Sequence, residues 1–220
     1  MISVCSIVRD EENNIRGMID NCLPYLREYD ELVIVDGGST DNTVKIIMEE
    51  YTDERIRLVK IKQNFKKRQW VNEAEVRNQA FAECTYDYIL SLDADEAYSP
   101  EFYQNIELII ECNPFATAFH IPTINFIGST KKIFKLHSWA DYHIRLVNKN
   151  FYKWVGKIHA SLWLGGKFPM PVGNPQVKLL DYFLYHYARV KGDIKRIYGP
   201  IPDVAIVDFN GFHPRREFDD

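Results

Sequence analysis

The chain has 220 residues, which is enough for one large domain or two small ones. Hydrophobic residues make up 46% of it and aromatic residues 14%, so the chain can bury a substantial core. A net charge of -4 gives no electrostatic reason to expect a basic, nucleic-acid-binding surface, so we expect no nucleic-acid partner.

The four cysteines match neither a CxxC pair nor a zinc-ligand pattern. Cys5 and Cys22 fall on apolar positions, which indicates small core residues and a reducing compartment, so we expect a cytoplasmic protein. The apolar run at residues 2–8 is too short for a signal peptide and has no basic leader. No segment reaches the roughly 18 apolar residues of a membrane span, and peripheral contact with a membrane stays open.

Predicted strands and helices alternate from residue 1 to 112. The predicted strands are the apolar runs at residues 2–8, 31–36, 56–61 and 88–92. The predicted helices are residues 15–23, which Pro24 ends; a segment with Val44, Ile47, Met48 and Tyr51 on one face; residues 70–83; and a segment that Ser99 caps before Pro100. This alternation predicts an α/β fold with a mostly parallel sheet and helices on both of its faces.

Short β-rich segments with many aromatic residues follow from residue 113 onward. No low-complexity linker separates them from the preceding part of the chain. We therefore expect a single domain over residues 1–220, with a nucleotide-binding α/β half at 1–112 and a β-rich half at 113–220.

Three polar clusters follow the predicted strands: VRDEEN, VDGGSTD and LDADE. Ligands of an open parallel sheet bind beyond the carboxyl ends of its strands, so these clusters are expected to converge. Asp93 and Asp95 together favour a divalent cation, which prefers oxygen ligands. Asp36, which precedes two glycines, could bind a ligand or only hold a turn, and Asp41 is expected to cap a helix.

These stretches also carry a resemblance to a known family. ISVCSIVRDEENNI, VIVDGGSTDNT, VRNQAF and YILSLDADE resemble, in order and spacing, the family 2 glycosyltransferases of the GT-A fold, which transfer a sugar from a nucleotide diphosphate donor. RLV at 145–147, GKIHA at 156–160 and YHY at 185–187 resemble a small bacterial and viral subgroup similar to lipopolysaccharide-core glycosyltransferases. That subgroup usually has Glu directly after the first of these histidines, where this chain has Ala160.

The resemblance implies roles for residues on the nucleotide side of the site. A divalent cation, Mn²⁺ or Mg²⁺, would be held by Asp95 and His186, with Asp93 either as a further ligand or on the ribose. A UDP- or GDP-type donor would be bound by the nucleotide-side set: Arg9, Glu11, Asp36, Arg77 and Asp93. Arg77 could instead be a solvated or ion-paired helix residue, and His186 could be a core or capping residue.

Inverting transfer to a hydroxyl of a carbohydrate or glycoconjugate acceptor needs a general base. Asp141 is the first candidate, because it is an acid in the aromatic-rich second half, and His159 is the second. Either residue could instead be an ordinary loop or core residue. Some aromatic residues of this half could stack on sugar rings, although most should belong to the core: Trp139, Tyr142, Trp154 and Trp163.

Three other functions compete with this interpretation. A haloacid-dehalogenase phosphatase needs its DxD on the first strand, whereas here it follows the fourth. A sugar nucleotidyltransferase needs a Gly-rich basic first loop, whereas VRDEEN is acidic. A catalytically inactive nucleotide-binding module of a larger protein remains an alternative, because Ala160 stands where the subgroup has an acid.

Overall fold

The computed structural model describes residues 1–61, 65–66, 69–70, 72–134, 141–157, 160–167, 169, 174–187, 190 and 206–209. Its first elements are β1 (Ser3–Val8), α1 (Ile15–Cys22), a 3-10 turn (Leu23–Tyr25), β2 (Glu31–Asp36), α2 (Thr43–Glu50), β3 (Ile56–Lys60), β4 (Phe65–Lys66), β5 (Gln69–Trp70), α3 (Glu73–Glu83), β6 (Tyr88–Ser91), β7 (Glu96–Tyr98) and α4 (Pro100–Glu111). The later elements are β8 (Ala118–Asn125), β9 (Lys132–Phe134), β10 (Asp141–Asn148), β11 (Tyr152–Val155), β12 (Ser161–Leu164), β13 (Val177–Leu179), β14 (Leu184–His186) and β15 (Ile206–Asp208).

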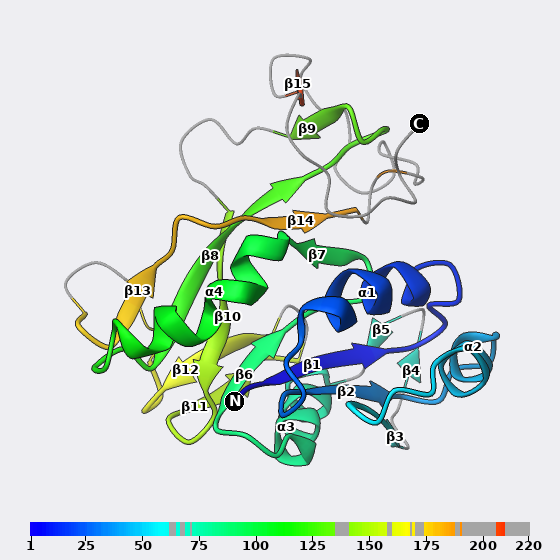
Figure 1. The fold of residues 1–220 in the computed structure, drawn as a ribbon, viewed down its shortest axis with the longest axis horizontal. Helices are drawn as coiled ribbons and strands as arrows, with labels where there is room; N and C mark the ends of the chain where they lie inside the picture. The colour runs from blue at the N-terminus through cyan, green and yellow to red at the C-terminus, as the bar shows by residue number, and fades with distance from the viewer. Residues whose placement is uncertain are drawn as a thin grey trace.

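Within the described residues, one nine-stranded sheet runs through the molecule (Figure 1). Its order is β3-β2-β1-β6-β10-β8-β14-β7, and β13 also pairs with β8. The strands from β3 to β6 are parallel, whereas β10 is antiparallel to both β6 and β8. The fold is therefore α/β with a largely parallel first part, as the sequence predicts, and the sheet takes strands from both parts of the chain.

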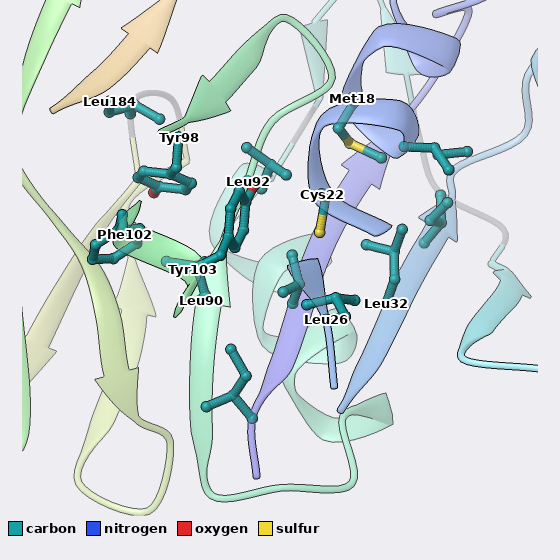
Figure 2. Close-up of a cluster of buried hydrophobic side chains, with 14 of the residues drawn as sticks. Met18, Cys22, Leu26, Leu32, Leu90, Leu92, Tyr98, Phe102, Tyr103 and Leu184 are labelled. Carbon is teal, nitrogen blue, oxygen red and sulfur yellow. The ribbon is translucent and has the colours of Figure 1, made fainter. Parts of the chain in front are cut away.

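Helices cover both faces of the parallel part. On one face, α1, α2 and α4 bury apolar side chains against β1, β2 and β6 in the larger core cluster. Figure 2 shows part of this cluster, with Cys22 of α1 between Met18 and Leu32, and with Tyr98 and Phe102 beside Leu184. On the other face, α3 packs through Ala80 and Phe81 together with the β11–β12 hairpin. The strands β1, β2 and β6 are thus buried on both sides, which explains their mainly apolar sequences, whereas the edge strand β3 is only half-buried.

The ends of two helices follow from their sequences. Pro24 lies in the 3-10 turn directly after α1, since its ring cannot continue an α-helix. The Ser99 side chain accepts a hydrogen bond from the Phe102 amide, and Pro100 is the first residue of α4. Both boundaries agree with the sequence prediction.

Two details differ from the prediction. Helix α3 begins at Glu73, with Asn72 as its capping residue, because residues 69–70 pair in the β4–β5 hairpin instead of joining the helix. Helix α2 buries Thr43, Ile46 and Ile47, whereas Met48 is exposed, so its apolar face is rotated from the expected one.

Candidate active site

The site lies where three strands end side by side. In the β1–β2 pair Val8 lies opposite Asp36, and in the β1–β6 pair Cys5 lies opposite Ser91. The three polar clusters therefore leave the same edge of the sheet, as parallel strands require.

The loops after β1 and β2 are tied together by hydrogen bonds. The Thr40 amide donates to the Asp10 carboxylate at 2.6 Å, and Asp10, with φ 57°, takes the left-handed conformation. The Glu11 amide donates to Thr43 Oγ1 at 2.7 Å, and Arg9 Nη1 donates to the Gly37 carbonyl at 2.7 Å. Arg9 and Glu11 are thus held at fixed places beside the second loop.

Asp36 is buried at the centre of its own turn. Its carboxylate accepts the amides of Gly38 at 3.0 Å and Ser39 at 3.1 Å, and also the Ser39 hydroxyl. Gly38 has φ 92°, a conformation that a side chain would strain. Asp36 therefore shapes the turn, and a ligand N–H would have to use the lone pairs that the turn leaves over. Asp41 accepts the Thr43 amide at 2.9 Å, which is the capping role expected for it.

Asp93 lies between two arginines from opposite parts of the chain. Arg77 of α3 reaches its two carboxylate oxygens at 3.2 and 3.3 Å, and Arg145 Nη1 of β10 lies 3.6 Å from Oδ2. Burial alone would raise the pKa of Asp93, but the two guanidinium groups outweigh it and hold the pKa below its usual value. Asp93 is therefore an anion whose oxygens are already engaged.

Glu96 fixes the turn that carries the acidic motif. Its Oε2 accepts the Asp93 amide at 2.9 Å, and its Oε1 accepts Arg145 Nη2 at 2.5 Å. The side chain is 2% exposed, and burial raises its pKa in spite of the ion pair with Arg145. Arg145 and Glu96 are two site residues to which the sequence analysis assigned no role. A charged residue within the apolar HIRLV strand is the available signal, since a buried charge needs a partner.

Asp95 and His186 come together from distant parts of the chain. β14 pairs with both β7 and β8, and this places His186 Nε2 at 3.6 Å from Asp95 Oδ2. His186 Nδ1 lies 2.7 Å from Asn125 Oδ1, so it donates there when the amide has this orientation. Burial would lower the pKa of His186, but Asp95 outweighs it and the pKa is raised.

The donor set of this pair suits a divalent cation. A proton on Nδ1 leaves the Nε2 lone pair of neutral His186 directed to the same place as the Asp95 carboxylate, the usual arrangement of a ligating histidine. In the part of the chain that the structure describes, no three histidine, cysteine, aspartate or glutamate side chains form a metal-binding group. A cation on Asp95 and His186 would therefore complete its shell with substrate oxygens and water.

Glu11 faces the same acidic region from the β1 loop. Burial raises the pKa of Glu11 to about 7, and the negative charges of Asp95 and Asp93 add to this effect. A hydrogen bond from Asn14 lowers the pKa and offsets part of the increase. A cation or a proton near these carboxylates would relieve their repulsion.

A pocket of about 410 Å³ opens beside Asp93 on the α3 face of the sheet. It is lined by α3, the acidic motif, β10 and the β11–β12 hairpin, and its polar lining includes Glu73, Arg77, Asp93, Tyr142, Arg145 and Trp154. The nucleotide-side residues and the β-rich half thus share one cavity.

Helix α3 holds the segment that carries the GKIHA motif. The first amides of the helix, those of Glu73 and Ala74, donate to the carbonyls of Lys157 and Gly156 at 2.9 and 3.2 Å. The Glu73 carboxylate accepts the Ala160 amide at 3.3 Å and Arg77 Nε at 2.8 Å. A carboxylate therefore does lie beside Ala160, although it comes from a residue that the sequence analysis did not single out.

The two candidate bases are only partly placed. Asp141 begins β10, opposite Thr123, and nothing further is described of its side chain. His159 lies outside the described residues. Their neighbours Tyr142 and Ala160 both line the pocket.

The aromatic residues proposed for sugar stacking differ in their surroundings. Arg77 covers the ring of Trp154 at 4.8 Å, so this face is occupied, whereas Tyr142 is 39% exposed at the pocket. Trp163 donates its indole N–H to Ser161 Oγ at 2.9 Å. Trp139 lies outside the described residues.

Comparison with known proteins identifies the family. The sequence model described as "Glycosyl transferase family 2" matches residues 3–164, which include all three strand-end clusters and the β11–β12 hairpin. The chain belongs to glycosyl transferase family 2. Residues 1–349 of the S. aureus protein TarS, in a crystal structure with UDP, share the GT-A fold at a TM-score of 0.50 and 19% identity, over 58% of this chain and 36% of that TarS chain.

Two curated relatives of this family 2 chain show how far the similarity extends. A TPR repeat-containing protein of Synechococcus elongatus is 33% identical over 54% of the chain and 26% of its own length. The glycosyltransferase SunS of Bacillus subtilis is 26% identical over 63% of the chain and 32% of its own length. The chain thus spans about a quarter to a third of the length of these relatives. Among its described residues, no helix is long and apolar enough to cross a membrane.

Proposed function

We propose that this family 2 chain transfers a sugar from a nucleotide diphosphate sugar to a hydroxyl of a carbohydrate or glycoconjugate acceptor. The observation that carries the proposal is the strand-end site, where Asp95 and His186 lie 3.6 Å apart beside an Asp93 that two arginines hold. The similarity to SunS, which is a glycosyltransferase, supports the same activity. A cytoplasmic location, with or without contact to a membrane surface, belongs to the proposal.

The nucleotide would lie across the loops after β1 and β2. In this arrangement Arg9 and Glu11 border the ribose or base, and Asp36 contacts the base of a UDP- or GDP-type donor. The hydrogen bonds between the two loops support this assignment, because they hold the three residues as one surface. Arg77 can approach the phosphates from α3, although it is also the main partner of Asp93.

The diphosphate would lie at the acidic motif. When bound there, Mn²⁺ or Mg²⁺ neutralises the charge that develops on the leaving diphosphate. Asp95 and His186 would hold the cation, and Asn125 would orient the His186 ring through Nδ1. Asp93, whose oxygens face Arg77 and Arg145, is better placed to position the donor than to serve as a full metal ligand.

The transfer would invert the anomeric configuration of a hexose-type sugar in one step. A retaining double displacement needs a free carboxylate at the anomeric carbon, whereas the acids of the motif are engaged by arginines or by the proposed cation. Inversion needs a base on the acceptor side, and Asp141, or else His159, would supply it. Tyr142 and Ala160, the neighbours of these residues, line the pocket beside Asp93, which supports the choice.

A thermal-shift screen tests the proposal against the alternative of an inactive nucleotide-binding module. We expect UDP- or GDP-sugars to raise the melting temperature of the wild type more with Mn²⁺ than without it, because a ligand that binds only the folded state stabilises it. Asp95→Asn should lose the Mn²⁺-dependent part and remain folded. Slow hydrolysis of the stabilising sugar nucleotide would separate an enzyme from a module, and an unchanged Mn²⁺ response in Asp95→Asn would contradict the metal assignment.

A further inference from the structure

Two buried hydrogen-bond donors at the pocket have no acceptor among the described residues. They are the indole Nε1 of Trp154 and the guanidinium Nε of Arg145. Both residues line the pocket beside Asp93. Both groups can only donate, so whatever satisfies them must present an acceptor oxygen. A buried donor left without a partner costs about 1–3 kcal/mol, which favours a ligand group at this place.

The Trp154 indole is held in a fixed orientation. The Asn78 side chain donates to the Trp154 carbonyl at 2.9 Å and accepts the Trp154 amide at 2.9 Å, so α3 grips this residue by its backbone. The Arg77 guanidinium lies 4.8 Å from the centre of the ring, and Phe81 meets the ring edge-on at 5.7 Å. The residue is 7% exposed. Trp154 therefore has a fixed indole ring with no open face, and its N–H is the group left without an acceptor among the described residues.

The charges around the pocket favour a neutral, hydroxyl-rich ligand. Arg77 is paired with Glu73 and Asp93, and Arg145 is paired with Asp93 and Glu96, so carboxylates largely balance the two positive charges at the pocket. The polar lining contains both hydrogen-bond donors and acceptors, and sugar hydroxyls can pair with either kind. Asp93 belongs both to this lining and to the motif proposed to hold the diphosphate, and the sugar ring is the donor group attached next to that diphosphate.

We propose that Trp154 is a specificity-determining residue whose Nε1–H donates a hydrogen bond to a hydroxyl or amide oxygen of the donor's sugar ring in this pocket. The inference rests on the proposed function. It assigns Trp154 to the sugar and not to the nucleotide. Removal of the N–H should therefore weaken the sugar nucleotide alone.

Isothermal titration of Trp154→Phe tests this assignment, because phenylalanine keeps an aromatic ring between Arg77 and Phe81. The probes are UDP, UDP-glucose, UDP-N-acetylglucosamine, GDP and GDP-mannose, each with Mn²⁺. For the sugar nucleotide that binds the wild type more tightly than its free diphosphate, the dissociation constant should rise about five- to tenfold, the scale of one lost hydrogen bond. The free diphosphate should bind as it does to the wild type.

Tyr152→Phe is the matched control, since Tyr152 lies on the same strand, is not part of the pocket lining, and its hydroxyl pairs with Thr117 Oγ1 at 3.1 Å. This variant should change neither dissociation constant. Replacement of Trp154 by benzothienylalanine, which has sulfur in place of the N–H on a ring of the same shape, repeats the test if phenylalanine disturbs the fold.

Two outcomes would overturn the assignment of Trp154, and a third would overturn the proposed function as well. Equal weakening of the diphosphate and the sugar nucleotide would make Trp154 a general support of the site, and no weakening of either would remove it from the site. If the wild type bound none of the five nucleotides, the proposed function itself would fail.

Discussion

Asp93 and Asp95 are two residues apart in the sequence and have opposite surroundings. Asp93 is engaged by Arg77 and Arg145, whereas the Asp95 carboxylate has, among the described residues, one ion-pair contact, at 3.6 Å to His186. The two side chains differ because they lie in a turn, which Glu96 closes by accepting the Asp93 amide. A DxD motif can thus divide its work between a carboxylate that maintains the site and one that is open to a cation.

Glu11 should make stability depend on pH. Its pKa is raised to about 7, so between about pH 4.5 and 7 the folded state binds the proton more tightly than the unfolded state. Stability from this group is fully present below that range and is lost as the pH rises through it. Allowing for the solvent that reaches the side chain, the loss should be about 1–2 kcal/mol.

We therefore expect Glu11→Gln to be more stable than the wild type at pH 8, and to lose this advantage near pH 4.5. Thermal melts in EDTA measure the difference without interference from a cation. Glu28→Gln, on an exposed residue, is the control and should show no such trend. An advantage of Glu11→Gln that stays the same at both pH values would contradict the proposed repulsion among the acids.

At the scale of elements, α3 is the part that joins the two sides of the site. Its first amides hold the segment at residues 156–157, its Arg77 holds Asp93, and its Asn78 holds β11. The helix therefore sets the distance between the acidic motif and the hairpin that closes the pocket.

Asn78→Ala should detach this hairpin from the helix. The change removes two hydrogen bonds to the backbone of Trp154, and we expect a loss of about 1–3 kcal/mol in the free energy of unfolding measured in urea. Asn105→Ala is the matched control, because its side chain bonds only to a carbonyl of its own helix. The prediction is wrong if both variants lose the same stability.

The sequence predicts elements well where local patterns decide them. Pro24 and Ser99 set helix boundaries by chemistry within a few residues, and the first, second and fourth predicted strands are mainly apolar because both faces are buried. The face of α2 could not be predicted, since Met48 would suit a buried stripe as well as Ile46 does, and only the position of the neighbouring helix excludes it.

The site could be predicted only in part, for the same reason. The strand-end acids follow from strand order, which the sequence reveals. The contact between Asp95 and His186 depends on the pairing of β14 with β7, whose positions are about 90 residues apart, and no local pattern encodes it. Arg145 and Glu73 also act through distant partners, so their roles became visible only in the folded chain.

At the scale of the whole molecule, the sheet brings the two parts of the chain to one cavity. β6 ends in the acidic motif, and β10, its antiparallel neighbour, carries Arg145 and begins at Asp141. The proposed donor side and the proposed acceptor side are thus adjacent strands of one sheet. An acceptor hydroxyl activated at the start of β10 would reach the donor sugar through the pocket between them.

Asp141→Asn should lower kcat by about 100-fold or more while donor affinity survives, because the amide keeps the shape and cannot accept the proton. NMR of the product should show the inverted anomeric configuration. Retention would refute the single-step mechanism. Inversion by a fully active Asp141→Asn variant would instead transfer the role of base to His159, and His159→Gln would then show the loss.

The ionic chain from Arg77 through Asp93 and Arg145 to Glu96 has a thermodynamic consequence. These four side chains hold one another through ion pairs and hydrogen bonds within the chain itself. The side chains of the acidic motif therefore lose little conformational entropy when the donor binds. Less of the free energy of the donor's contacts with the motif is then offset by ordering the protein. A rigid template of this kind rejects a donor of the wrong shape more strongly than a loop that must fold around its ligand.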